Sequence, residues 1–173
     1  DQSDFYTHEW SPAKKEKIAI IYAVGGIAPG KSNPGPAGSS RMGHKTIGKA
    51  IESARKNEDI KAIVMRVDSP GGSVYASDQI WREVMKSTED DSSNVKPFIV
   101  SMSDIAASGG YYIACQADTI IASPATITGS IGVFWFRPNF SKLANRFGVN
   151  TEWIKEGEYS DFYTGGRLFN NYE

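Results

Sequence analysis

A serine between small residues is the position in this sequence best suited to chemistry. Ser108 follows an apolar run and stands at the start of an expected helix, with Gly109 directly after it. Its hydroxyl would be exposed beside the Gly109 N–H, an arrangement that a nucleophile with an oxyanion donor requires. A second turn, residues 68–73, also follows an apolar run, and Gly71 or Gly72 could supply another donor. Small-residue turns are also common packing devices, so the residues alone leave catalysis and a structural crossing both open.

Other chemistry-bearing residues give weaker signals. His8 and His44 lie in polar or terminal stretches, and we expect both to be solvated. Cys115 is the single cysteine, and its apolar surroundings predict a small buried side chain rather than a nucleophile. Asp68 could act as an acid, but an aspartate before Ser-Pro-Gly-Gly favours a turn-forming role. The chain has no phosphate-binding loop, dinucleotide fingerprint or multi-cysteine pattern, so we expect no cofactor and no metal.

Composition sets limits on the class of protein. The 173 residues are 40% hydrophobic with a formal net charge of −1, about the size of one domain. Basic residues are scattered and matched by acidic ones, which argues against nucleic-acid binding. No run of about 18 apolar residues occurs, so we expect no transmembrane helix in this chain. It opens DQSDFYTHEW, without a signal peptide, and we expect it to come from the middle of a longer protein.

Short apolar runs alternate with helix-period segments, a pattern typical of βαβ units and a largely parallel, buried sheet. Strands are expected at residues 18–24, 61–67, 98–102, 120–122, 131–134 and 151–154. Helices are expected from a Thr46 cap to about Asn57, around Ile80 and Val84, from the Ser108 turn through Ile113, and around Leu143 up to Gly148. Residues 25–43 read as a long mobile loop. Ligands of open α/β sheets bind at the carboxyl ends of strands, where both turns would lie.

Three segments together resemble the signal peptide peptidase A (protease IV) family of the ClpP/crotonase superfamily. They are VDSPGGSVYASDQIW, SMSDIAASGGYYIACQAD and ATITGSIGV, in this order between Val67 and Gly132. The resemblance implies an α/β fold, a ClpP/crotonase-like spiral of ββα units with a mostly parallel sheet flanked by helices. It also predicts an amino-terminal arm at residues 1–17, a peptidase domain at 18–161 and a partial tail at 162–173.

The resemblance further implies a serine peptidase with a Ser/Lys dyad. Ser108 matches the family nucleophile, and Gly109 with Gly71 or Gly72 matches the oxyanion-hole glycines. Ser130 matches the serine whose hydroxyl bonds the general-base lysine. The position of that lysine in short members is occupied here by Ser160.

Two other lysines do not replace the missing base. Lys155 matches a family position beside the true base, and Lys142 is expected to face solvent. Long members are tandem duplications whose amino-terminal repeat supplies the lysine. The chain therefore resembles the carboxyl-terminal, serine-bearing repeat of a long-form member, and mutational loss of the base is the competing explanation.

Partners and location follow from the same resemblance. Family members degrade released signal peptides and other hydrophobic peptides at the membrane and assemble into rings or domes. We therefore expect hydrophobic peptide substrates, a lysine-bearing repeat or neighbouring protomer, a homo-oligomer, and a membrane anchor outside this chain. The location would be the bacterial inner membrane facing the periplasm, or the thylakoid in a plant. A catalytically inactive scaffold of the same fold is the main alternative, and an acyl-CoA enzyme of the crotonase kind is a further one.

Overall fold

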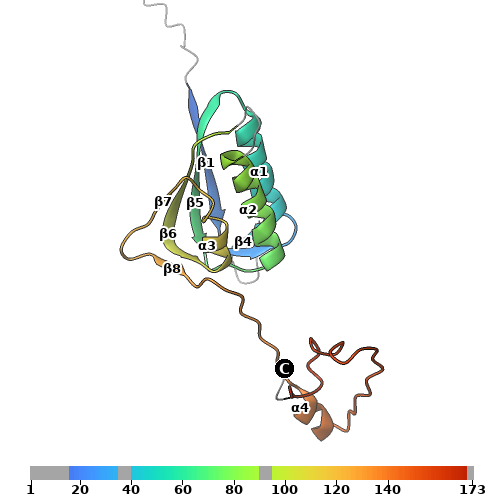
Figure 1. Cartoon of the computed structure of the whole chain (residues 1–173). Helices are drawn as coiled ribbons and strands as arrows, with labels where there is room; N and C mark the ends of the chain where they lie inside the picture. The colour runs from blue at the N-terminus through green and yellow to red at the C-terminus, as the bar shows by residue number, and fades with distance from the viewer. Residues whose placement is uncertain (1–15, 35–39, 90–94, 171–173) are drawn as a thin grey trace, which may run out of the picture. The chain divides into compact units, whose positions relative to one another are not determined.

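A parallel sheet supports the first of two compact units, residues 1–133 and 134–173. The computed structural model describes residues 16–34, 40–89 and 95–170. The strand order is β1 (Lys17–Val24), β5 (Ile60–Ser69), β6 (Phe98–Ala107) and β7 (Thr119–Ile121), as Figure 1 shows. β8 (Ile127–Gly129) pairs with the carboxyl end of β6, and all these pairings are parallel. The predicted α/β class with a mostly parallel sheet is confirmed.

One face of this sheet carries the hydrophobic core. Side chains alternate along β5, and Ile63, Met65 and Val67 are fully buried. Helices α1 (His44–Lys56) and α2 (Val74–Thr88) lie side by side over this face (Figure 1). On the other face, alternate β1 side chains such as Ile20 and Tyr22 are exposed. Within the described residues the sheet is therefore covered on one side, whereas the apolar runs predicted burial on both.

The two long helices begin by different means. α2 starts at Ser73, whose Oγ accepts a hydrogen bond from the Ala76 N–H at 3.3 Å. α1 starts at His44 after Gly43, so the predicted cap at Thr46 is wrong. The Thr46 hydroxyl instead accepts a hydrogen bond from the Ser32 N–H at 2.8 Å and ties the helix to the preceding segment.

That preceding segment forms a small second sheet rather than the predicted loop. β2 (Gly26–Ala28) pairs in parallel with β4 (Ser40–Gly43), which pairs with β3 (Asn33–Pro34). His44 is half-buried beside this sheet, because its Nδ1 accepts a hydrogen bond from the Gly30 N–H at 3.1 Å. The solvated state predicted for His44 is therefore wrong, and His8 lies outside the described residues.

Two of the later predicted strands are absent from the described part of the chain. Residues 131–134 and 151–154 are not in strands, and the strand that pairs with the carboxyl end of β6 is β8 at 127–129. The helix predicted around Leu143 is present as α4 (Ser141–Arg146), and Gly148 follows it with φ 72°. No helix in the described ranges is long and apolar enough to cross a membrane.

The second unit is organised by aromatic rings. Trp135 stacks on Phe162 at 5.5 Å between ring centroids, and Tyr163 and Phe169 pack around the pair. The Arg137 guanidinium lies 3.6 Å from the centroid of the Phe169 ring and donates to two backbone carbonyls of the same segment. Much of the aromatic tail thus packs within its own unit, and Tyr172 lies outside the described residues.

Candidate active site

Ser108 has a strained backbone at the junction between β6 and the short helix α3 (Gly109–Tyr112). Its φ is 51° and its ψ is −119°, a conformation that side chains with a Cβ rarely adopt. Two backbone hydrogen bonds hold it there: its N–H donates to Gly129 O at 2.8 Å, and its carbonyl accepts from the Tyr112 N–H at 2.9 Å. Strain of this kind persists only where the surroundings enforce it, and it is concentrated at functional sites.

Close packing of two glycine turns brings the predicted residues together. A Cβ on Gly71 would lie 2.6 Å from the Gly109 nitrogen, and one on Gly109 would lie 2.5 Å from Ser77 Oγ. Gly71 also has φ 97°, which favours glycine. The turn after β5 and the turn after β6 therefore touch backbone to backbone, which requires glycine at both positions.

The backbone N–H groups of these turns are not equivalent. The Gly71 N–H donates to Ser69 Oγ at 3.1 Å. In contrast, neither Gly72 nor Gly109 donates a backbone hydrogen bond to any described residue. A Cβ built on Gly109 would lie 3.3 Å from the Gly72 nitrogen, so the two free donors are close neighbours beside Ser108. The N–H groups of Gly72 and Gly109 are therefore available to a ligand, whereas the N–H of Gly71 is already hydrogen-bonded.

An apolar cavity of about 350 Å³ opens beside Ser108. Its lining residues are Gly72, Val74, Ser77, Ser108, Gly109, Tyr111, Tyr112, Cys115, Ile131, Gly132 and Val133. The Tyr112 hydroxyl donates to Asp78 Oδ1 at 3.2 Å, and its ring stacks on Trp81, so α2 fixes this wall. Burial and the neighbouring Asp78 raise the pKa of Tyr112. A wall of this composition suits an apolar side chain.

Cys115 lines this cavity and is exposed, so the predicted burial is wrong. The helix that precedes it has a single turn, which leaves the following residue at the opening rather than in the core. Its thiol donates to Tyr112 O at 3.1 Å, and desolvation by the cavity wall raises its pKa. A thiol with a raised pKa is a poor nucleophile at neutral pH. The sequence carries no signal for this exposure, because the surrounding residues are apolar.

Ser130 lies next to the carbonyl that holds Ser108. It follows Gly129, the acceptor of the Ser108 N–H, and it too has a positive φ, 52°. No lysine or histidine lines the cavity within the described part of the chain. The described lining of this cavity therefore combines a serine with free N–H donors.

The lysines of the second unit have other surroundings. Lys155 Nζ lies 3.2 Å from Asp161 Oδ2 and forms a salt bridge with it. Hydrogen bonds from Arg167, and then from Lys155, hold the pKa of the Asp161 carboxyl well below its usual range. Ser160 Oγ donates to Gly157 O at 3.1 Å, and Lys142 lies in the first turn of α4.

A solved protease structure shares the α/β fold of this chain. A mutant of the 1510-N membrane-bound stomatin-specific protease superimposes with a TM-score of 0.55 at 20% identity, over 77% of this chain and 59% of that one. This likeness shows the fold.

Sequence comparison then finds similarity to a peptidase family. The model of peptidase family S49 matches residues 90–171. The chloroplastic serine protease SPPA of Arabidopsis thaliana is 44% identical over 85% of this chain and 21% of that protein. Protease 4 of Haemophilus influenzae is 40% identical over 84% of this chain and 22% of that protein. The chain is thus similar to peptidase family S49 over residues 90–171, and it spans about a fifth of the length of these two relatives.

Proposed function

We propose that this chain carries the nucleophile of a serine endopeptidase and that Ser108 is that nucleophile. The observation that carries the proposal is the strained Ser108 backbone beside two unengaged N–H groups and an apolar cavity. Similarity to peptidase family S49 supports the same proposal. The cavity accounts for a preference for hydrophobic peptides, because burying an apolar side chain there contributes about 25 cal/mol per Å².

In the proposed reaction, Ser108 Oγ attacks the scissile carbonyl while a neutral lysine takes the hydroxyl proton. The carbonyl oxygen becomes an oxyanion and accepts hydrogen bonds from the Gly72 and Gly109 N–H groups. The protonated lysine then gives its proton to the leaving amine, and water hydrolyses the acyl-enzyme. A lysine can act in this way only where its pKa falls well below about 10.4. Ser130 would hold that lysine through its hydroxyl.

The lysine comes from outside the described residues in this proposal. None lines the cavity, and Lys155 is paired with Asp161. We assign the chain to the carboxyl-terminal, serine-bearing repeat of a long-form enzyme, whose other repeat or neighbouring protomer supplies the base. This assignment agrees with the small share of its relatives that the chain spans.

Released signal peptides and other hydrophobic peptides are the proposed substrates. Cleavage would take place at a membrane, with the enzyme anchored by a segment outside this chain and assembled as a ring or dome. We place it at the bacterial inner membrane facing the periplasm, or at the thylakoid if the source is a plant. One relative is a chloroplastic protein, which supports the second possibility.

A catalytically inactive scaffold of the same fold is the alternative function. It is favoured by the lack of a lysine or histidine among the residues that line the cavity. In this case the glycine turns would serve folding alone, and the serine would have no reactivity above that of an ordinary hydroxyl.

Hydrolysis of an apolar reporter peptide distinguishes the two functions. The assay uses the longer protein that contains this chain, with Ser108→Ala as the test and Ser40→Ala, at an exposed serine of β4, as the matched control. We expect Ser108→Ala to abolish hydrolysis without unfolding the protein and Ser40→Ala to retain it. A wild-type rate in Ser108→Ala would show that Ser108 is not the nucleophile. Absence of hydrolysis in every protein tested, the wild type included, would favour the scaffold.

A further inference from the structure

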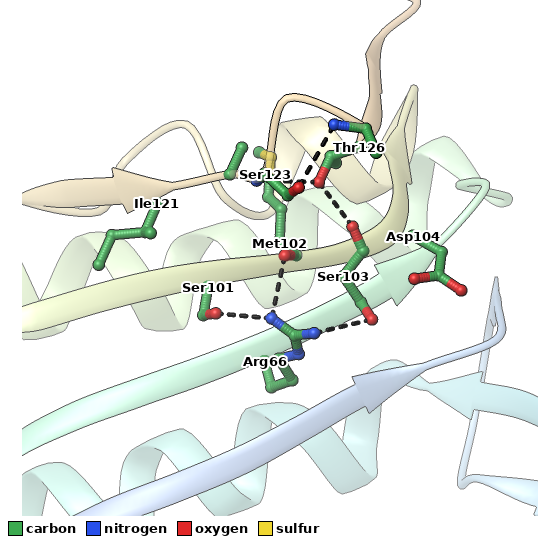
Figure 2. A pocket seen from close by; sticks show the side chains of 10 residues that line it. Arg66, Ser101, Met102, Ser103, Asp104, Ile121, Ser123 and Thr126 are labelled. Carbon is green, nitrogen blue, oxygen red and sulfur yellow. Dashed lines mark hydrogen bonds between the residues drawn. The ribbon is translucent and has the colours of Figure 1, made fainter.

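A second cavity, of about 540 Å³, is separate from the one beside Ser108 and shares none of its lining residues. Arg66 of β5 lies at its base and alternates with the buried residues on either side, so it projects from the sheet face opposite α1 and α2. Figure 2 shows β6 and the segment that follows β7 forming the other walls. The polar members of the lining include Ser101, Ser103 and Asp104.

Arg66 is held by neutral acceptors. Nη1 donates to Ser101 Oγ at 2.7 Å and to Met102 O at 3.0 Å, and Nη2 donates to Ser103 Oγ at 2.9 Å (Figure 2). No carboxylate among the described residues forms an ion pair with Arg66. A guanidinium has five N–H donors, so these three bonds leave two donors, including the one on Nε. The cation is thus fixed in position by neutral groups, without a direct ion pair to a described carboxylate.

Hydroxyl groups extend this set of donors. Ser101 and Ser103 each accept from Arg66, which leaves the hydrogen of each hydroxyl available to donate. Thr126 cannot contribute in the same way, because its hydroxyl donates to Ser103 O at 2.8 Å. The Thr126 hydroxyl instead stabilises the wall, because it also accepts a hydrogen bond from the Ser123 N–H at 3.2 Å. The cavity therefore presents one cation and two oriented hydroxyls.

We propose that this cavity binds a single carboxylate group of a peptide. A planar guanidinium with two free N–H groups matches the two oxygens of a carboxylate, and charge-assisted bonds of this kind are among the strongest. Exposed Asp104 lies at the rim, apart from the Arg66 fork in Figure 2, and disfavours a doubly charged phosphate. Ile121, Ala122 and Ala125 add apolar lining, which suits an aliphatic carrier better than a free inorganic anion.

A metal ion does not fit the same cavity. The described residues contain no group of three or more histidine, cysteine, aspartate or glutamate side chains that could hold one. The Arg66 charge would also repel a cation. The carboxylate can come from a peptide carboxyl terminus or from an acidic side chain, and both present the same two oxygens.

The Arg66 Nε–H signal and the backbone N–H signals of Ser101 and Ser103 in a ¹H–¹⁵N NMR spectrum of the 173-residue chain test this site, and the backbone signals report binding in variants that lack Arg66. The probes are acetate, its neutral analogue acetamide, the tripeptide acetyl-Ala-Ile-Ala with a free carboxyl terminus, the same peptide amidated, and amidated acetyl-Ala-Glu-Ala. Arg66→Met removes the cation. Ala125→Trp, at an exposed position, narrows the cavity while Arg66 stays in place, and Arg41→Met at an exposed arginine is the matched control.

We expect acetate to shift the Arg66 signal and acetamide to leave it unchanged. The free-acid peptide or the glutamate peptide should bind, and whichever binds more tightly identifies the source of the carboxylate. Arg66→Met and Ala125→Trp should each weaken binding by about 10-fold or more, with no effect of Arg41→Met. Binding of the amidated Ala-Ile-Ala peptide as tightly as its acid, or no binding of either carboxylate peptide, would overturn the proposal.

Discussion

Replacing Ser108 by glycine should stabilise the chain while removing the proposed nucleophile. The positive φ of Ser108 costs on the order of 1–3 kcal/mol for a residue with a Cβ. Glycine accepts this conformation, but its freedom in the unfolded chain costs about 0.5–1 kcal/mol. The Ser108 hydroxyl makes no hydrogen bond to a described residue, so its loss adds little. The net gain is about 1 kcal/mol, which corresponds to a rise in Tm of about 4 °C.

Thermal unfolding of the 173-residue chain followed by circular dichroism measures this effect. Ser108→Ala keeps the Cβ and should leave the Tm nearly unchanged. Ala107→Gly, at the buried neighbour with an ordinary φ, should lower the Tm, because it adds flexibility and removes a packed methyl group. A Ser108→Gly variant that unfolds as early as Ala107→Gly would refute the argument that the turn stores strain.

Three further perturbations probe the site and the second unit. Gly109→Ala places a Cβ 2.5 Å from Ser77 Oγ, which must move, and 3.3 Å from the Gly72 nitrogen, and it should slow fluorophosphonate labelling of the longer protein about 100-fold. Gly48→Ala, where the nearest contact is an ordinary 3.5 Å, should leave labelling unchanged and add about 0.5–1 kcal/mol of stability. The Asp161 pKa is lowered on folding, so its contribution to stability is complete above the unfolded pKa of about 3.9 and is lost as pH falls further. An acid titration followed by tryptophan fluorescence should show this loss of stability in the wild-type chain and not in Asp161→Asn. The same titration curve in both proteins would contradict the role of the ion pair. The raised pKa of Cys115 predicts that the rate of its reaction with iodoacetamide still increases above pH 9, and the adduct should block the cavity. A rate that reaches a plateau near pH 7 would contradict this prediction.

Periodicity in the sequence was sufficient to predict β1, β5, β6 and β7 of the main sheet and its helices, but not the short strand β8. Alternation in β5 and β6 and the helical spacing of Ile80 and Val84 reflect burial against one core, which local patterns encode directly. The short strands of residues 26–43 were missed because they span two to four residues each and depend on pairing with distant segments. Their glycine, serine and proline content looks like that of a loop.

The candidate site was predictable in part for the same reason. Its two glycine turns could be located from sequence because each directly follows an apolar strand. The strained φ of Ser108 and the difference between the Gly71 and Gly72 N–H groups depend on tertiary contacts that no local pattern encodes. Exposure of Cys115 and the neutral hydrogen-bond acceptors of Arg66 likewise depend on which neighbours the fold brings close.

Mapping the covalent adduct of a fluorophosphonate probe tests most directly whether Ser108 is the nucleophile. The longer protein that contains this chain is treated with the probe, digested and examined by mass spectrometry, with Ser108→Ala treated in parallel. We expect an adduct on Ser108 in the wild-type protein and on no serine in the variant. An adduct on another serine, or equal labelling of Ser108→Ala, would contradict it.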